Sequence, residues 1–574
     1  MKSNQNNFNT IFFKDNKKVF KIVSFVQTKK IYVLGCFLLL VSFIDLVSLG
    51  SLPILVGSLL NENFINNNNF ELLGEFKSYL SRDNIFYFVF IIFLLKVIAN
   101  LLFLAYQTFF YKDLFASLSS KLFKHYLFEK YLVINKYTTS ILVRNLTAEV
   151  NLVVLYFKAY VNFFKEILFF LIIFITCIFL NWKITLIAVF YFFCFVYIFS
   201  LIFKSYLTKL SSQSQIIREK QLQTINQTFR AIQDVKVSLI ENLILKSYKK
   251  NIQKRYLLEG ITQIIASSPR IILEFLVVGS LLIFIIYILN NGYSGENLIG
   301  ILSLVTIISL RFIPTFNIIT SSLLQFKTIT ASIDLLSKEF ERNNPEYIRE
   351  EVGQISFNNT IKFQNLNFSY KETLVLDSLI LRINKGDFIG IYGKSGSGKS
   401  TFLNILSGLI NSDEGYFYVD NERITSKNIL NWFNTISYVP QNNFIFDDSI
   451  KNNICLSIQN EEIDQKLLEK SIYCSALEDL SIDIDNFMCG EDGKYLSFGQ
   501  KQRLAIARAI YQNKDIIILD ECTSNLDDRS ESKIIERFKN HLSDKTGIIV
   551  SHKFSSLEIC NKIFEMKDGK LLER

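Results

Sequence analysis

Apolar stretches long enough to cross a bilayer fill the first 325 residues of this 574-residue chain, and more polar sequence follows. A transmembrane helix needs about 20 apolar residues to span roughly 30 Å of hydrocarbon. Six windows meet this length, at residues 31–60, 84–110, 160–180, 184–204, 269–290 and 297–322. The pattern predicts a polytopic α-helical membrane domain with six transmembrane helices over residues 1–338, a linker over 339–357 and a second domain over 358–574.

Polar sections separate and extend these apolar windows. Residues 181–183 (Asn-Trp-Lys) are all that divides the third window from the fourth, which predicts a tight helical hairpin. The segments 112–159 and 205–268 are too long for loops and keep a helical period, so we expect the helices to continue about 25–35 Å into the cytosol. Each extension should bend back through a short transverse helix, near residues 143–149 and 239–243.

The distribution of charge predicts the orientation. Residues 1–30 hold seven lysines and one acid, whereas residues 61–83 hold four acids and two bases. Positively charged flanks stay in the cytoplasm, so the N-terminus should lie inside and the loop 61–83 outside. The net charge of +9 then follows from topology and anionic inner-leaflet lipid. Nucleic-acid binding is the weaker interpretation, because no basic stripe alternates with exposed aromatic residues.

Composition agrees with a membrane protein, since 50% of the residues are hydrophobic and the mean hydropathy is +0.26. The first 22 residues are polar and basic, so no signal peptide is expected. The eight cysteines contain no C-x-x-C pair and fall in predicted membrane helices or in the second domain. We therefore expect neither a cysteine metal site nor disulfides.

The second domain contains a glycine-rich loop of the form G-x4-G-K-[ST]. In such a loop, backbone N–H groups at a helix N-terminus surround the β- and γ-phosphates, the lysine neutralises them and the next hydroxyl binds Mg²⁺. Lys399 and Ser400 take these two places. The sequence predicts an ATP and Mg²⁺ site formed by Gly393, Lys394, Ser395, Gly396, Ser397, Gly398, Lys399, Ser400 and Thr401.

A second glycine-containing segment, Leu-Ser-Phe-Gly-Gln, occupies residues 496–500 and continues as Lys-Gln-Arg-Leu-Ala-Ile-Ala-Arg. It resembles the signature of ATP-binding-cassette (ABC) ATPases, which implies an α/β P-loop nucleotide-binding domain. The resemblance implies that Ser497, Gly499 and Gln500 contact nucleotide. Phe498 replaces the glycine of the commonest family form. The two residues through which the family binds phosphate, Ser497 and Gly499, are unchanged. In this family the signature of one cassette closes on the ATP of another, which implies a dimer of this chain.

The resemblance also assigns catalytic roles. Residues 516–519 are an apolar strand followed by Asp520, expected beside Mg²⁺, and Glu521, expected to act as general base on the attacking water. Gln441 should complete the Mg²⁺ and water shell and sense the membrane domain. His552 should touch the γ-phosphate.

Two further residues match family positions. Tyr370 matches the aromatic residue that stacks on adenine, and Asp527 lies in the loop that crosses to the partner subunit. Taken singly, a tyrosine after a strand is usually a sheet edge, and a lone histidine such as His552 is usually a surface residue. The family order and spacing of the whole set favour the functional interpretation.

The cations Lys96, Arg270 and Arg311 lie inside predicted transmembrane helices. A cation at the centre of the hydrocarbon costs about 2.5–3.5 kcal/mol on insertion scales. One interpretation is a basic cavity for an anionic headgroup. The alternative is that these side chains snorkel to an interface or pair with Asp45 or Glu274.

Residues 268–274 (Ser-Pro-Arg-Ile-Ile-Leu-Glu), 309–314 (Ser-Leu-Arg-Phe-Ile-Pro) and 332–335 resemble bacterial flippases of the PglK type. Members of that family move pyrophosphate-linked oligosaccharide lipids to the periplasmic side, and arginines at matching places are implicated in handling them. Their outer loop carries a short amphipathic helix, and residues 70–80 here have apolar side chains at 70, 73, 76 and 80. Lys96 replaces an arginine of that family, which keeps the charge without the bidentate fork.

These resemblances imply an ATP-driven flippase of an anionic lipid-linked oligosaccharide in the inner membrane, with the cassette in the cytoplasm. An ABC exporter of lipids, peptides or drugs is the main alternative. A non-transporting ATP-regulated module is disfavoured, because a gate needs no intact base at residue 521.

Overall fold

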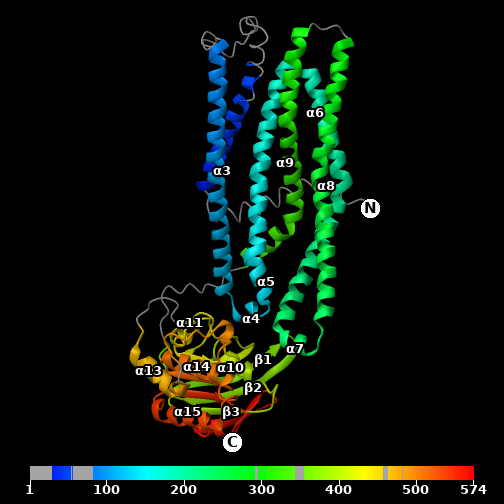
Figure 1. Cartoon of the computed structure of the whole chain (residues 1–574). Helices are drawn as coiled ribbons and strands as arrows, with labels where there is room; N and C mark the ends of the chain where they lie inside the picture. The colour runs from blue at the N-terminus through cyan, green and yellow to red at the C-terminus, as the bar shows by residue number, and fades with distance from the viewer. Residues whose placement is uncertain are drawn as a thin grey trace. The chain divides into compact units, whose positions relative to one another are not determined.

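The computed structural model describes the backbone of residues 29–48, 50–52, 55, 82–290, 295–342, 355–456, 463–480 and 483–574, and it omits many side chains between residues 172 and 327. The chain divides into two compact units, whose elements are labelled in Figure 1. The helical unit comprises Met1–Leu127 and Thr138–Asn343, and the cassette unit comprises Phe128–Tyr137 and Asn344–Arg574. The later point of division falls within the predicted linker.

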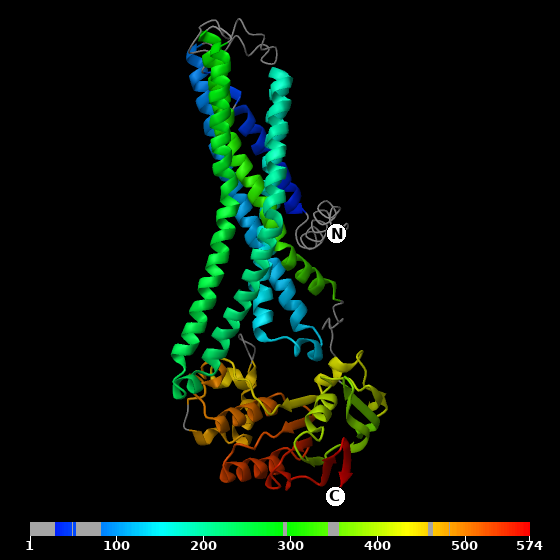
Figure 2. The same ribbon diagram turned by 90° about the vertical axis from the view of Figure 1, so that its right-hand side faces the viewer.

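Long helices build the helical unit, and each predicted apolar window lies wholly or partly in one of them. Besides the span Lys29–Leu52, they are α3 (Arg82–Leu127), α6 (Val150–Arg230), α8 (Glu241–Asn290) and α9 (Gly295–Glu341). α6 packs along α8 and α9, and α3 packs on α6 (Figure 2). The helices run well past the apolar windows, as the helical period of the polar segments predicts.

Among the described residues, two helices are long and apolar enough to cross a membrane, Lys29–Leu52 and Asn84–Leu127. Much of the apolar surface of the second is uncovered, since Phe90 is 68% exposed and Leu101 is 60% exposed. Apolar surface of this extent is unfavourable in water. Its length, composition and exposure suit a helix that faces lipid.

Helical hydrogen bonding continues through residues 181–183 of Val150–Arg230, so the hairpin predicted there has no separate loop. The chain nevertheless reverses inside this span (Figure 1). Phe326 of α9 packs on Tyr156, with 4.8 Å between ring centroids, and the neighbouring Leu324 packs with Leu210. A straight helix would separate Tyr156 from Leu210 by about 80 Å, so α6 doubles back as the two adjacent apolar windows predict.

The first transverse helix was predicted at residues 143–149, but this segment belongs to the helical unit. It spans the end of α5 (Thr139–Arg144) and a π-helix, η2 (Asn145–Glu149), that leads directly into α6. The reason is a contact with another helix: Asn145 is buried, and its Nδ2 donates to Tyr126 Oη of α3 at 2.9 Å.

The short helix that associates with the cassette unit is α4 (Tyr131–Ile134), which lies earlier in the chain. Leu132 of α4 packs against the hydrophobic core of that unit. The second transverse helix was predicted at 239–243. There the chain instead turns at Leu239, whose φ of 53° is left-handed, after a short helix α7 (Ile232–Val237).

Two sheets form the cassette unit. One is antiparallel with the order β2-β1-β4-β5, and the other has the order β10-β9-β3-β8-β7-β6. The strands are β1 (Thr360–Tyr370), β2 (Thr373–Asn384), β3 (Phe388–Tyr392), β4 (Glu414–Val419), β5 (Glu422–Arg423), β6 (Ile436–Val439), β7 (Ile516–Asp520), β8 (Thr546–Val550), β9 (Lys562–Lys567) and β10 (Lys570–Glu573). The helices are α10 (Lys399–Leu406), α11 (Ile429–Phe433), α12 (Ile450–Cys455), α13 (Gln465–Cys474), α14 (Phe498–Tyr511) and α15 (Asp528–His541), with short 3-10 turns at Leu477–Leu480, Glu491–Gly493 and Ser555–Leu557.

The central strands β3, β8, β7 and β6 run parallel, and every residue of β7 and β8 is buried. Their isoleucine-rich sequences fit this place, because strands of a parallel sheet are covered on both faces. Parallel strands bring their carboxyl ends to one edge, where ligands bind in open α/β sheets. The predicted catalytic residues follow these carboxyl ends, so the topology gathers them.

Candidate functional site

The glycine-rich loop joins β3 to α10, and its glycines meet steric needs that other residues could not. Gly396 and Gly398 have φ angles of 82° and 105°, in the left-handed region that favours glycine. At Gly393, a Cβ atom would lie 2.4 Å from the carbonyl oxygen of Met566 in β9. The loop is therefore held tightly between β3 and its neighbour β9.

Lys399 opens α10 and is nearly fully buried, with its Nζ donating to the carbonyl oxygens of Gly393 at 2.7 Å and Lys394 at 3.0 Å. Burial lowers the pKa of this ammonium, while the carboxylates of Glu521 and Asp520 act to raise it. The hydroxyl of Ser397 is buried without a hydrogen-bond partner. A cation and an unpaired hydroxyl inside one loop fit a ligand rich in acceptor oxygens, such as phosphate.

Glu521, directly after β7, is the centre of the site. Its Oε2 accepts a hydrogen bond of 2.7 Å from Gln441 Nε2, and its Oε1 lies 3.0 Å from His552 Nε2. The three residues follow the carboxyl ends of β7, β6 and β8. Glu521 has a φ of 49°, and its backbone N–H donates to Val550 O at 2.9 Å, so the neighbouring strand helps to hold this strained residue.

Asp520 ends β7 and is 5% exposed. Burial raises the pKa of its carboxyl, and the adjacent Glu521 acts in the same direction, against a hydrogen bond from Tyr438 and the charge of Lys399. Tyr438 Oη donates to Asp520 Oδ2 at 3.3 Å. No role was predicted for Tyr438 from the sequence, although it begins the Tyr-Val-Pro-Gln segment that ends at Gln441.

The residues present fit a magnesium nucleotide. Mg²⁺ commonly takes one or two carboxylates together with substrate phosphates, and Asp520, Gln441 and the hydroxyl of Ser400 are the predicted protein ligands. Ser400 and Thr401 occupy the first turn of α10, directly after Lys399. Each of these side chains belongs to the same edge of the sheet as Glu521.

Tyr370 ends β1 and pairs in register with Thr373 of β2. Its ring is partly exposed and meets Phe368 edge-on, with 4.9 Å between centroids. The next residues of β2 reach the phosphate loop, since a Cβ on Gly398 would lie 3.1 Å from Val375 O. Tyr370 thus lies on the hairpin beside the loop, and its contact with adenine stays a prediction.

The signature segment begins α14. Ser497 is the N-cap: its hydroxyl accepts from Gln500 N at 3.3 Å, while Gln500 Oε1 accepts from Ser497 N at 2.7 Å. This reciprocal capping box fixes the start of the helix. Phe498 is 55% exposed, and Ser497 is also exposed. Gly499 lies close to the next loop, where a Cβ would approach Asn525 O to 3.3 Å.

Asp527 caps α15 by accepting from Ser530 N at 3.0 Å. This hydrogen bond is the main reason why the pKa of the Asp527 carboxyl lies below its usual value. Gln502 of α14 links the same loop to the signature helix, because its Nε2 donates to Ser524 Oγ at 3.2 Å and its Oε1 accepts from Asn525 N at 3.2 Å. The crossing of Asp527 to a partner subunit stays a prediction.

A buried polar network that the sequence analysis missed connects the segments after Glu521 and His552. Glu531 of α15 is 2% exposed and accepts hydrogen bonds from Ser556 Oγ and, at 3.1 Å, from Lys553 Nζ. The hydroxyls of Ser556 and Thr523 lie 2.8 Å apart. No motif reveals these contacts, because each joins residues distant in sequence.

Of Lys96, Arg270 and Arg311, only Lys96, in α3, has a described side chain. Its Nζ lies 3.5 Å from Asp45 Oδ1 and donates to Ser48 Oγ at 3.0 Å. The structure therefore contains the internal pairing with Asp45 that was the alternative to a ligand role. The side chains of Arg270 and Arg311 and the stripe at residues 70–80 lie outside the described part of the chain.

Comparison with known proteins bears on the cassette first. Residues 376–524 match the ABC transporter family model, a range that contains the phosphate loop, the signature and Glu521. The chain is 33% identical over 232 residues to an ATP-dependent lipid A-core flippase of Wigglesworthia glossinidia brevipalpis, covering 39% of this chain and 40% of that protein. It is 30% identical over 301 residues to a putative export ATP-binding/permease protein of Rickettsia typhi, covering 51% of this chain and 48% of that protein.

These alignments span about half or less of the length of the curated relatives. A solved structure of a bacterial Atm1-family ABC exporter with ATP bound superposes with a TM-score of 0.79 and covers 95% of both chains at 17% sequence identity. At that identity the likeness concerns the fold. The fold is that of ABC exporters: a helical membrane domain followed by an α/β P-loop cassette.

Proposed function

We propose that this chain is one half of a dimeric ABC exporter that hydrolyses ATP in its cassette and uses the energy to move an anionic lipid across the cytoplasmic membrane. The observation that carries the proposal is the position of Glu521, within hydrogen-bond distance of both Gln441 and His552 at the edge of the sheet. A general base must be held within such reach of the proton that it removes.

The chain's own residues divide the work as follows. The ammonium of Lys399 donates hydrogen bonds to the carbonyl oxygens of Gly393 and Lys394. When ATP binds, it would donate to phosphate oxygens instead. Glu521 accepts the proton of the attacking water, while Gln441 and His552 fix the direction of its carboxylate. Mg²⁺, when bound, supplies positive charge for the phosphoryl group. Tyr438 holds Asp520, the predicted metal ligand, in place.

A dimer is supported by the exposure of the signature. Ser497 and Phe498 are exposed at the start of α14, where backbone N–H groups and the helix dipole favour an anion. We propose that this helix start closes on the γ-phosphate of ATP held by the second copy. Each ATP then lies between the Lys399 loop of one chain and Ser497 of the other.

The substrate is proposed as an anionic lipid, most specifically a polyprenyl-pyrophosphate-linked oligosaccharide moved from the cytoplasmic to the periplasmic leaflet. Several relatives are named lipid A-core flippases, which supports a lipid. The segments around Arg270 and Arg311 support the lipid-linked oligosaccharide. Export of another lipid, a peptide or a drug is the second candidate, supported by the relative named as an export protein.

Reconstituted proteoliposomes test the proposal. Wild-type protein should move extracted lipid-linked oligosaccharide in an ATP-dependent manner, and the double variant Lys96→Gln/Arg311→Gln should lose this transport. Neutral lipid of the same chain length serves as control. ATP-dependent movement of the neutral lipid, with none of the anionic one, would refute an anionic substrate.

A further inference from the structure

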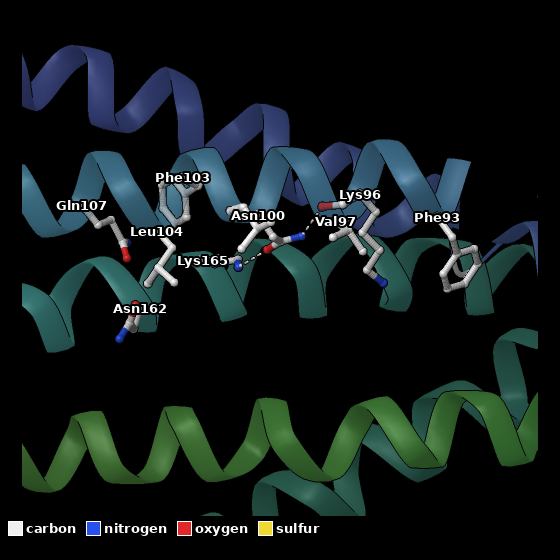
Figure 3. Close-up of a pocket in the computed structure, with 10 residues that line it drawn as sticks. Phe93, Lys96, Val97, Asn100, Phe103, Leu104, Gln107, Asn162 and Lys165 are labelled. Atoms are coloured by element: carbon white, nitrogen blue, oxygen red, sulfur yellow. Dashed lines mark hydrogen bonds between the residues drawn. The ribbon is translucent and has the colours of Figure 1, made fainter. Parts of the chain in front are cut away.

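A cavity of about 480 Å³ lies in the helical unit between α3 and α6 (Figure 3). One face of α3 lines it from Phe93 to Gln107, and Asn162 and Lys165 line it from α6. Among these residues, only Lys96 was predicted from the sequence to have a role. The cavity therefore joins residues from two predicted transmembrane windows that no motif connects.

The polar lining of this cavity consists of two ammonium groups, from Lys96 and Lys165, and three side-chain amides, from Asn100, Gln107 and Asn162. No carboxylate is among the ten described residues that line it. Ammonium groups are donors only. The lining thus favours a ligand with negative charge and several acceptor oxygens.

Two acids lie close to these cations, and one of them, Asp45, already balances the charge of Lys96. Asp45 has a side chain only 3% exposed and binds Lys96 at 3.5 Å and Asn100 Nδ2 at 3.3 Å. Glu166, next to Lys165 in sequence, is buried and accepts a hydrogen bond of 2.7 Å from Thr315 Oγ1 of α9. Asn100 Oδ1 accepts from Lys165 Nζ at 3.4 Å, which orients the ammonium along the wall of the cavity (Figure 3).

Gln107 gives an independent observation. It is 7% exposed, and its Nε2 has no hydrogen-bond partner. A buried donor without a partner is costly, so such a group needs a ligand or water to satisfy it. Gln107 and Asn162 are close to the same end of the cavity in Figure 3, which gives that end two amides for a phosphate oxygen.

The remaining residues that line the cavity are apolar, and several of them are exposed. Val97, Leu101 and Leu104 line the cavity and are each more than half exposed. A hydrocarbon chain that covered them would remove this surface from water or replace lipid there. The cavity thus combines a donor-rich wall with an apolar edge.

We propose that this cavity binds the phosphate of an anionic amphiphile, with Lys165 and Gln107 binding phosphate oxygens and Val97, Leu101 and Leu104 contacting the first part of its hydrocarbon chain. At the opposite end of the cavity, Asp45 acts as a positioning residue, because its carboxylate holds the ammonium of Lys96. This inference rests on the proposed function, because it gives the place at which the transported lipid binds.

Binding of fluorescent dioleoylphosphatidic acid and dioleoylglycerol to the full-length protein in nanodiscs tests the site. Wild type should bind the phosphate-bearing lipid and not the neutral one. Lys165→Gln and Gln107→Leu should each weaken that binding about tenfold, as expected for loss of one charge-assisted or one buried hydrogen bond. Lys165→Arg should retain it. Lys158→Gln, an exposed lysine on the same helix outside the cavity, is the matched control.

Equal binding of phosphatidic acid by wild type and by both cavity variants would overturn the site. Polyprenyl pyrophosphate and inorganic pyrophosphate are the competing probes: displacement by the first supports an amphiphile, and equal displacement by the second overturns the role of the apolar edge. Lipid transport by wild type is measured separately. If wild type transports lipid and the cavity variants bind phosphatidic acid as well as wild type does, only the cavity proposal is refuted. If wild type does not transport lipid, yet the cavity variants lose binding of phosphatidic acid, the proposed function is refuted and the cavity stands as a binding site.

Discussion

Gln441 Nε2 donates a hydrogen bond of 2.7 Å to Glu521 Oε2, although the two residues are 80 positions apart. The bond joins the carboxyl ends of β6 and β7, and His552 approaches the other oxygen of the same carboxylate. Any movement of the segment after β6 therefore changes the direction of the proposed base. This contact gives the cassette a physical means to link nucleotide chemistry with movement elsewhere.

Glu521→Gln should lower ATP turnover by about 10²–10⁴-fold, because the amide cannot accept the proton of the attacking water. ATP binding should remain, since Lys399 and Asp520 are unchanged. Steady-state ATPase and nucleotide binding of the purified variant measure the two effects. Glu536→Gln, an exposed residue of α15, should behave as wild type. Near-normal hydrolysis by Glu521→Gln would remove Glu521 from the role of base.

A mixed dimer should distinguish sites within one chain from sites shared by two. Lys399→Ala removes the ammonium that should bind phosphate, and Ser497→Arg places a bulky side chain in the signature where phosphate should bind. Each homodimer should therefore be inactive. Combined as a heterodimer, the two variants should keep one complete site and regain part of the ATPase activity. Ser497 also caps α14, and loss of a cap costs about 1 kcal/mol, so thermal melting must show that the variant is folded.

If the mixed dimer regains no activity, either a single site cannot turn over or the shared site is wrong. Cross-linking separates these outcomes. A cysteine introduced as Ser497→Cys should form an ATP-dependent cross-link to the phosphate loop of the second chain. Its absence with ATP bound would contradict the shared site.

Asp420 predicts a pH-dependent contribution to the stability of the cassette. Burial raises the pKa of its carboxyl, but hydrogen bonds from the backbone N–H groups of Asn358, Asn359 and Thr360, at 2.6–2.8 Å, outweigh this effect and leave the pKa below normal. A lowered folded pKa gives stability that is present above the unfolded value of about 3.9 and is lost as the pH falls through the folded value.

Asp420→Ala should therefore reduce the free energy of unfolding at pH 7 by about 1 kcal/mol, the low end for a charged acceptor because the site is partly exposed. Denaturant unfolding at pH 7 and at pH 3 measures the change. The difference from wild type should shrink at the lower pH. A difference that stayed constant across this range would rule out the ionised carboxylate as its source.

Lys96 and Asp45 should show energetic coupling. Breaking a buried ion pair by removing one partner costs about 3–5 kcal/mol, because the other charge is left uncompensated. Lys96→Gln and Asp45→Asn should each lower the melting temperature in detergent, and the double variant should lose less than the sum. Strictly additive losses would show that the 3.5 Å contact contributes no interaction energy.

The sequence predicted which proposed catalytic residues of the cassette would gather at one edge, because each follows an apolar strand. Asp520, Glu521 and His552 end or follow such strands, and a parallel sheet brings those ends to one edge. The sequence could not predict Tyr438 on Asp520, because that contact depends on how far β6 lies from β7. Lys165 was missed for a similar reason: its partner Asn100 is 65 positions away, and nothing local marks the lysine as different from a cation near the membrane surface.

The transverse helices show where local pattern fails. Residues 143–149 had the polar and apolar mixture expected of a surface helix, yet Asn145 forms a buried bond with Tyr126. Leu132, in a helix of only four residues, gave no periodic signal. Packing between distant segments decided both outcomes.

The place of Leu132 has a consequence for how this chain can be recombined. Residues 128–137 belong to the cassette unit, although the rest of that unit begins at Asn344. A cassette exchanged between relatives at the linker alone would lose the segment that covers part of its core and expose the apolar surface under α4. Chimeras should carry residues 128–137 together with the cassette, so these ten residues and the cassette would be under shared selection as one inherited module.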